Sequence, residues 1–172
     1  VVVCDIWGKA ASPDSVASQI VDISTDPTCA PEGGWENKYT NPFGANGTVP
    51  KKYSDAIIYE MHIRDWSRAF VADSTGKFID LANSEGFVNH LEDLGITHVQ
   101  LVPVFDYAQT NDDDSYNWGY NPYHYNVPEG RYVKDMKDGS DSVKQFRTFI
   151  KKLHDAGIAV NMDVVYNHTS GT

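Results

Sequence analysis

The sequence predicts an α/β fold, namely the first three β-strands and two helices of a (β/α)8 barrel. The first observation is the order of the patterns, because short hydrophobic strands near residues 56–63, 97–102 and 159–165 alternate with two helix-like segments. This order is typical of parallel strands joined by right-handed crossovers. The second observation is that each strand has one polar face, whereas an open, doubly wound sheet is apolar on both faces. A closed barrel with a polar upper interior fits both observations.

Each predicted strand alternates apolar and polar side chains, so its two faces differ. In the third strand, for example, Val160, Met162 and Val164 lie on one face. We expect the other face of the sheet to carry a row of polar side chains from the three strands: Glu60 and His62, His98 and Gln100, and Asn161 and Asp163.

The two helices between the strands have recognisable ends. The first follows Ser84, a favoured N-cap residue, and stops before Gly95, which suits a left-handed C-terminal position. Ser140 or Asp141 is expected to cap the second, and Gly157 is expected to end it. Both have an apolar stripe that would cover the sheet, formed by Phe87, Val88, Leu91 and Leu94 in the first and by Val143, Phe146, Ile150 and Leu153 in the second.

The chain is predicted to divide near residue 50. Residues 1–50 have a short β-like start, Val1 to Trp7, and then turn-forming pairs such as Asp26-Pro27 and Asn46-Gly47. We interpret them as the end of an N-terminal β-sandwich domain and a linker. Residues 51–172 would be the first part of the barrel. A complete barrel takes about 250 residues, so a truncated barrel is expected.

Composition excludes several functions. The net charge of −10 and the lack of a basic cluster argue against nucleic-acid binding. No apolar run is long enough to predict a membrane span. The two cysteines form neither a disulfide framework nor a metal motif. No targeting segment is recognisable, so the sequence assigns no cellular location. Ten Tyr and four Trp point instead to a ligand with apolar faces, such as a sugar.

Two segments concentrate the residues that suggest chemistry. The first is AVNMDVVYNHT, Ala159 to Thr169, where a hydrophobic strand ends in a polar cluster. The second is YNWGYNPYHYNVPEG, Tyr116 to Gly130, an aromatic segment after the second strand that we expect to be a loop without regular secondary structure. Both would lie at the carboxyl ends of the strands, where barrel enzymes build their sites.

These segments, with VPVFDY (Val102 to Tyr107) and IIYEMHIRDWS (Ile57 to Ser67), resemble the start of the catalytic domain of type I pullulanases. Pullulanases are starch-debranching members of the α-amylase superfamily. The resemblance covers about residues 51–172, while residues 5–22 resemble the last strands of the preceding β-sandwich. One departure is Asn121, because the family usually has Asp there.

The resemblance implies retaining hydrolysis of α-1,6-glucosidic bonds in pullulan, starch or glycogen dextrins, with an α-glucan as the partner. It further implies that the nucleophile and the acid come from later strands, so no catalytic residue is expected in this chain, and the chain alone should be inactive. The residues that it carries would bind substrate. Tyr120 would stack under the sugar ring, His168 would hydrogen-bond its primary hydroxyl, Asp163 would brace the floor and Trp118 would line the adjoining wall.

No cofactor is expected to be required, and no metal ligand is assigned. Calcium is possible by resemblance, through the amide oxygen of Asn167, although a side chain that only fixes the turn fits as well. Finally, the outer strands of a partial barrel leave backbone groups unpaired. We therefore expect self-association through this edge, or coverage of the exposed face by residues 1–50.

Three other interpretations stay open. A metal-dependent barrel hydrolase could use His62, His98 and His168, although these lack the usual ligand spacing. A non-catalytic α-glucan-binding protein would keep the aromatic loop without the chemistry. A different activity of the same superfamily, such as that of an isoamylase, an amylopullulanase or a branching enzyme, is also compatible with the motifs.

Overall fold

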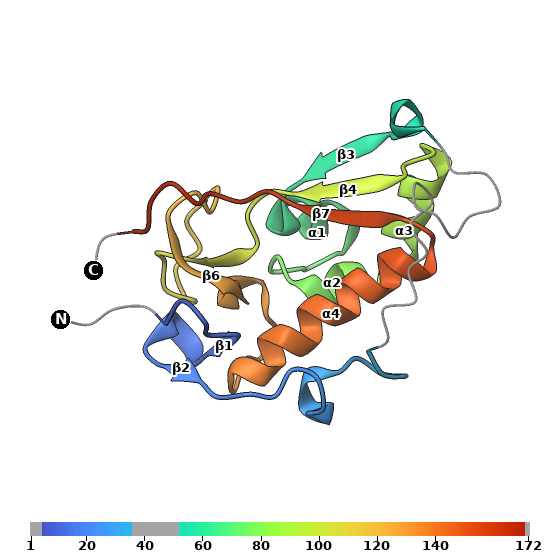
Figure 1. The fold of residues 1–172 in the computed structure, drawn as a ribbon. Coiled ribbons are helices and arrows are strands. Elements are labelled where there is room, and N and C mark those ends of the chain that lie inside the picture. The colour runs from blue at the N-terminus through green and yellow to red at the C-terminus, as the bar shows by residue number, and fades with distance from the viewer. Residues whose placement is uncertain (1–4, 36–51, 171–172) are drawn as a thin grey trace.

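The computed structural model describes residues 5–35 and 52–170. At its centre, a parallel sheet has the strand order β3 (Ile58–Met61), β4 (His98–Leu101) and β7 (Ala159–Met162) (Figure 1). Each strand is four residues long, and the pairs are in a regular parallel register. The predicted α/β fold with three parallel strands is therefore confirmed.

The register brings the predicted polar row together. Glu60 pairs with Gln100, and Gln100 pairs with Asn161, so the three side chains are level across the sheet. Gln100 Nε2 donates to Glu60 Oε2 at 3.0 Å. Glu60 and Asn161 are exposed, whereas Met61 and Leu101 on the opposite face are buried against the helices. Alternation along the strands thus predicted the two faces correctly at these positions.

The helices lie on one face of the sheet, the lower one in Figure 1. The two predicted helices are α3 (Glu85–Asp93) and α4 (Gly139–Asp155). Ser84 caps α3 as predicted, since its side chain accepts a hydrogen bond from Phe87 N at 3.2 Å. Gly95 and Gly157 have φ angles of 68° and 74°, in the left-handed region that only glycine adopts without strain.

The predicted start of α4 was wrong. The N-cap is Asp138, whose Oδ1 accepts from Ser140 N at 2.8 Å. Asp141 completes a capping box, because its Oδ2 accepts from Asp138 N at 3.3 Å. Asp138, Ser140 and Asp141 are all residue types that cap helices, and in the structure Asp138 is the N-cap.

Two helices were not predicted, α1 (Ile63–Phe70) and α2 (Phe78–Ala82). The sequence pattern predicted that the first strand extends to Ile63, but β3 ends at Met61. Trp66 N donates to the carbonyl oxygen of His62 at 3.1 Å, which starts α1. Ile63 is buried in the helix, so its apolar character fitted both interpretations equally well.

The aromatic segment is only partly a loop. Residues 122–128 form β6 (Pro122–Pro128), which pairs antiparallel with β5 (Phe105–Tyr107). The absence of regular structure was therefore a wrong prediction for this half of the segment. The other half, which we call the aromatic loop (residues 115–121), does lie between the two strands as a loop. Its base is closed by the bond from Ala108 N to Asn121 O at 2.9 Å.

The N-terminal segment packs on the outer side of α4. It contains β1 (Ala10–Ala11) and β2 (Ser18–Gln19), which form an antiparallel pair, and the 3-10 turns η1 (Pro13–Ser15) and η2 (Pro27–Cys29). Arg147 of α4 donates to the carbonyl oxygens of Ile23 and Cys29 at 2.7 and 3.1 Å. The described part of this segment thus packs against α4 and not on the polar face of the sheet, while residues 1–4 and 36–50, which belong to the same prediction, lie outside the described residues.

Other predictions for this segment have different outcomes. The β-like start falls partly on residues 1–4, which lie outside the described residues, while residues 5–7 form a turn rather than a strand. The assignment of 1–50 to a β-sandwich and linker stays a prediction. The remaining 3-10 turns are η3 (Tyr53–Asp55) and η4 (Gly130–Tyr132). Within residues 5–35 and 52–170, we find no helix with the length and apolar character needed to cross a bilayer.

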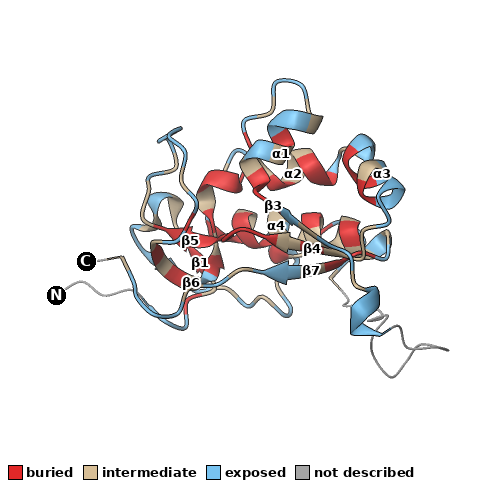
Figure 2. Ribbon diagram, turned by 90° about the horizontal axis from the view of Figure 1, so that it is seen from above, coloured by how far each residue is buried: buried red, intermediate tan, exposed pale blue. Residues whose placement is uncertain are grey.

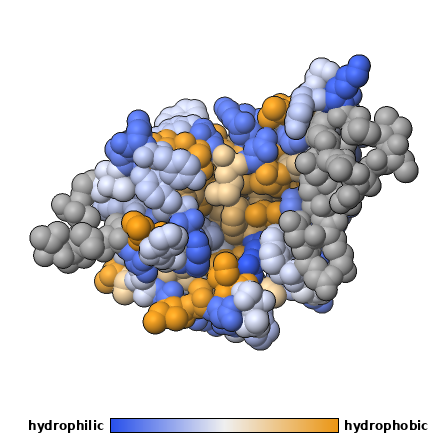
Figure 3. All heavy atoms as spheres, in the orientation of Figure 1, coloured by the Kyte–Doolittle hydropathy of each residue, from blue (hydrophilic) through white to orange (hydrophobic). Residues whose placement is uncertain are grey.

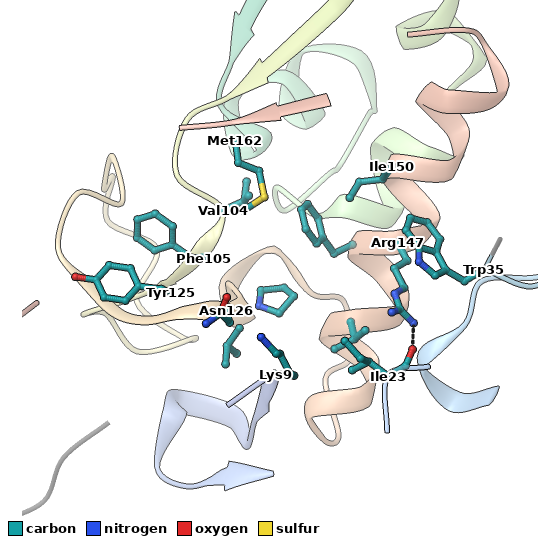
Figure 4. Close-up of a pocket in the computed structure, with 14 residues that line it drawn as sticks. Lys9, Ile23, Trp35, Val104, Phe105, Tyr125, Asn126, Arg147, Ile150 and Met162 are labelled. Atoms are coloured by element: carbon teal, nitrogen blue, oxygen red, sulfur yellow. Dashed lines mark hydrogen bonds between the residues drawn. The ribbon is translucent and has the colours of Figure 1, made fainter. Parts of the chain in front are cut away.

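The core lies between the sheet and the helices, where Figure 2 shows the buried residues facing one another. Aromatic rings make up much of it, and Phe78 contacts Tyr132, Phe146 and Phe149. Beside β7, hydrophobic side chains gather in the middle of the face shown in Figure 3. They line a pocket of about 290 Å³ between β7, α4 and the β5–β6 hairpin, to which Met162, Ile150 and Phe105 contribute (Figure 4).

Candidate substrate-binding site

The site lies where the sheet ends and the aromatic loop passes over it. Asp163 directly follows β7, and its backbone N–H donates to Leu101 O at 2.9 Å, which continues the parallel pairing by one residue. Its side chain is reached from the loop, because the Tyr120 hydroxyl donates to Asp163 Oδ2 at 2.6 Å. Two residues 43 positions apart are thereby joined at the carboxyl end of the sheet.

His168 completes this cluster. Its Nε2 lies 3.0 Å from the carbonyl oxygen of Tyr120, and its Nδ1 lies 2.8 Å from Oδ1 of Asn167. Its own carbonyl oxygen accepts from the Tyr125 hydroxyl at 2.6 Å. The structure therefore brings together three of the predicted site residues, Tyr120, Asp163 and His168. Both ring nitrogens of His168 have partners in the protein, so a hydroxyl ligand would have to share or replace one of them.

The electrostatics of the cluster keep Tyr120 neutral. The hydrogen bond to Asp163 is the main cause that raises the pKa of Tyr120 to about 12, and partial burial adds to it. The hydroxyl therefore stays protonated and available to donate throughout the physiological range. Tyr120 is 41% exposed, which leaves part of its ring open to a ligand.

Trp118, the fourth predicted site residue, lies two positions before Tyr120 in the same loop. It is 55% exposed, and its ring meets Tyr116 edge-on at a centroid distance of 5.3 Å. Tyr116 in turn stacks on the buried ring of His62. Trp118 is thus placed on the rim, supported from below by Tyr116 and His62, and not within the cluster around Asp163.

Sequence reasoning misplaced His62. Alternation put it on the polar face of the sheet, but the strand ends one residue earlier and His62 is buried beneath the aromatic loop. Its Nε2 lies 3.1 Å from the carbonyl oxygen of Asn117. The signal that could have located it is its position as the first residue after a strand, because such residues point toward the carboxyl end of the sheet.

A buried carboxyl group supports the loop from behind. Glu129 is completely buried and accepts hydrogen bonds from Tyr107 N at 3.0 Å and Arg131 N at 2.7 Å. Burial is the main cause that raises the pKa of Glu129 to about 8, and the nearby Asp106 adds to the shift. Sequence reasoning gave this residue no role, since a lone Glu after a strand carries no distinctive signal.

Asn121 shows what the departure from the family pattern does locally. Its Nδ2 donates to Ala108 O at 3.2 Å across the base of the loop, a bond that an aspartate cannot make. Its Oδ1 is buried without a hydrogen-bond partner in the described structure. The Asn121 amide therefore helps to close the base of the loop, where an aspartate would place a negative charge.

Metal ligation has little support in the described part of the chain. No group of three or more His, Cys, Asp or Glu there is arranged to hold an ion. The three histidines proposed for a metal hydrolase are engaged separately, His62 with Asn117, His98 with Thr97 and His168 with Tyr120. The Asn167 amide oxygen, the candidate calcium ligand, is already paired with His168. The set does not fit a metal centre, and calcium binding stays a prediction.

Comparison with known proteins identifies the family. Residues 71–172 match the family described as the catalytic domain of α-amylase, which is more than half of the chain. The chain belongs to the α-amylase family. The matched range contains the aromatic loop and the whole cluster of Tyr120, Asp163 and His168.

Within this family, the chain is similar to pullulanases. It is 31% identical to the pullulanase of Klebsiella pneumoniae, with 98% of this chain and 22% of the relative covered, and 37% identical to that of Bacillus subtilis, with 66% and 18% covered. A solved structure of the Paenibacillus barengoltzii pullulanase, in complex with maltohexaose and α-cyclodextrin, matches with a TM-score of 0.80 at 37% identity over 97% of this chain and 27% of that one. The chain thus spans about a fifth of the length of the curated relatives.

Proposed function

We propose that the protein containing this chain is a debranching glycoside hydrolase that cleaves α-1,6-glucosidic bonds in pullulan, starch or glycogen dextrins. The observation that carries the proposal is the cluster of Tyr120, Asp163 and His168 at the carboxyl end of the sheet. It occurs in a chain of the α-amylase family whose relatives include pullulanases. The chain supplies the substrate-binding rim.

The geometry of the cluster suits a neutral sugar. A tyrosine ring with an exposed face can stack on a pyranose, and the bond to Asp163 fixes its tilt. His168 holds the backbone of Tyr120 and presents an exposed imidazole beside it. Trp118 extends the aromatic surface along the rim. The polar side chains of Glu60, Gln100 and Asn161, in a row across the sheet, offer hydrogen-bond partners to the hydroxyl groups of a sugar.

The reaction that we propose is retaining double displacement. It requires a nucleophilic carboxylate and a carboxylic acid about 5 Å apart, on either side of the scissile bond. We assign neither to this chain. The role of its residues is to bind and orient the ring that becomes planar and positively charged in the transition state, which Tyr120 can stabilise through its π-face.

The proposal is tested with the full-length protein and pullulan. Release of maltotriose with new reducing ends supports it, and maltotriose release from pullulan distinguishes α-1,6 from α-1,4 cleavage. A protein that binds pullulan in affinity electrophoresis but releases no reducing ends would instead be the non-catalytic glucan-binding protein. Cleavage of amylose without cleavage of pullulan would point to another activity of the family.

We also propose that the 172-residue polypeptide self-associates through the edge of its sheet. In the described structure β3 and β7 are the outer strands, so each has one side without a strand partner. Met162 at the end of β7 is 42% exposed beside the apolar pocket. An unpaired edge next to exposed apolar surface favours pairing with another copy.

A further inference from the structure

The bond between His62 and the aromatic loop links a residue of the barrel wall to the residues that would meet the substrate. His62 is the residue between β3 and α1, and it is 6% exposed. Its Nε2 lies 3.1 Å from the backbone carbonyl oxygen of Asn117. Asn117 stands between Tyr116 and Trp118, so this contact holds the middle of the loop.

The partners define the protonation of the ring. A carbonyl oxygen can only accept a hydrogen bond, so Nε2 must carry the proton. Among residues 5–35 and 52–170, buried Nδ1 has no hydrogen-bond partner, which suits a bare lone pair better than an N–H group. Burial is the main cause that lowers the pKa of His62, which agrees with a neutral ring. His62 is therefore a fixed donor aimed at the loop.

A chain of hydroxyl groups meets the ring at the same nitrogen, so the single Nε2–H is shared between Asn117 O and the Tyr132 hydroxyl. The Tyr132 hydroxyl lies 3.1 Å from His62 Nε2 and accepts from the Tyr107 hydroxyl at 3.2 Å. Arg131 donates to the Tyr107 hydroxyl at 3.2 Å and also to Ser115 O at 2.7 Å. Besides its bonds at Tyr120 and Asn121, the loop is thus held at Ser115 through Arg131 and at Asn117 through His62, with Tyr116 between these two points.

The attachment at Asn117 is passed on to the residues that follow. Asn117 Oδ1 accepts from Gly119 N at 2.8 Å. Gly119 has a φ of 85°, and a Cβ there would lie 3.0 Å from Pro103 and Tyr107, so the backbone has little freedom at this position. A shift of Asn117 would therefore be transmitted to Trp118 and Tyr120 on either side of the glycine.

We infer that His62 is a positioning residue whose Nε2–H bond to Asn117 O sets the placement of Trp118 and Tyr120 for the substrate. The inference rests on the proposed function only for what the loop binds. The placement of the loop by His62 is a property of the protein in the absence of substrate. Its stacking on Tyr116, at 5.0 Å and 26°, is a second contact that the experiment must separate from the hydrogen bond.

The experiment compares three substitutions in the full-length protein. His62→Gln keeps an amide donor at the distance of Nε2, His62→Met has a similar length without a donor, and His62→Phe keeps the stacking ring without a donor. His90→Met is the matched control, because His90 is a half-buried histidine among the rings of Tyr59, Trp66 and Phe70, away from the loop.

Two measurements are made on each variant, amide hydrogen exchange of residues 115–121 and steady-state kinetics with pullulan. We expect His62→Met and His62→Phe to speed exchange in the loop, to raise KM, and to lower kcat/KM by roughly tenfold to a hundredfold, as small displacements of binding groups do. His62→Gln should stay within a few-fold of the wild type in both measurements. Simple loss of folded protein would lower apparent kcat and leave KM unchanged.

The inference is overturned if His62→Met and His62→Phe match the control in loop exchange and KM, or if His62→Gln loses as much as they do. If His62→Phe alone stays normal, stacking positions the loop and the hydrogen bond does not. A wild-type protein that leaves pullulan intact refutes the proposed function, while the exchange data still decide the role of His62.

Discussion

Replacing Tyr120 separates the two tasks that the structure gives to this residue, which are to present a ring and to bind Asp163. Tyr120→Ala removes both, whereas Tyr120→Phe keeps the ring and removes only the 2.6 Å hydrogen bond from the hydroxyl to Asp163. Both changes are made in the full-length protein. Because Tyr120 is on the loop surface and 41% exposed, neither substitution should leave a core cavity.

The expected losses follow from the two interactions. Stacking of a base on an aromatic ring, a related contact, is worth about 1–3 kcal/mol. At about 1.4 kcal/mol per tenfold change in rate, Tyr120→Ala should lower kcat by roughly tenfold to a hundredfold. A hydrogen bond to a charged group contributes about 1.5–3 kcal/mol when buried. The bond to Asp163 is solvent-accessible, so we expect Tyr120→Phe to cost about 1 kcal/mol or less, roughly fivefold in rate at most.

The assay measures kcat and KM separately from reducing ends released over a series of pullulan concentrations. Stacking that strengthens as the ring becomes planar and positive acts mainly on kcat. An unchanged turnover number in Tyr120→Ala would refute the reasoning and place Tyr120 in the packing of the loop. A Tyr120→Phe variant as impaired as Tyr120→Ala would show that the bond to Asp163, and not the ring, is what matters.

Three further predictions concern the chain itself. The 172-residue polypeptide should release no reducing ends from pullulan, and turnover within tenfold of the full-length protein would overturn the assignment of its residues to binding. Light scattering over a concentration series should show that the average mass of this polypeptide rises with concentration. A monomer at every concentration would show that the unpaired strand edges do not cause self-association. Since the pKa of Glu129 is raised from 4.5 to about 8, the folded state binds the extra proton, so this residue's stabilising contribution should be complete below pH 4.5 and be lost as the pH rises through 8. The thermal stability of Glu129→Gln should decline less steeply with rising pH over that range. An unchanged decline would show that other groups cause the pH dependence.

Much of the fold was predictable because the relevant signals are local. Apolar and polar residues alternate along each strand because successive side chains point to opposite faces of a sheet. This alternation put Glu60, Gln100 and Asn161 on the polar face, and the register then places the three side chains level with one another. Ser84 and the two glycines at the ends of α3 and α4 act within a few residues of themselves. The motifs around Tyr120 and His168 likewise pointed to the correct end of the sheet.

The errors fall where two local patterns are equally good. Ile63 is apolar in a strand and apolar in a helix, so only packing against the helices decides that β3 ends at Met61. Asp138, Ser140 and Asp141 are all good N-caps, so local sequence alone does not show that Asp138 is the one used. The pairing of β6 with β5 depends on a partner that lies 15 or more residues away, which local alternation does not reveal.

The sequence by itself predicted the α/β class, the parallel strands and the polar face, and it proposed Tyr120, Asp163, His168 and Trp118 as candidate substrate-binding residues. The tertiary structure alone decided how they meet. Asp163 accepts a hydrogen bond from Tyr120, which lies 43 residues away in the sequence. His62 does not lie on the polar face, and its Nε2 contacts the carbonyl oxygen of Asn117, which lies 55 residues away. Contacts of this kind depend on the distance between two chain segments, and that distance is fixed by the packing of the whole sheet against its helices, which no single segment encodes.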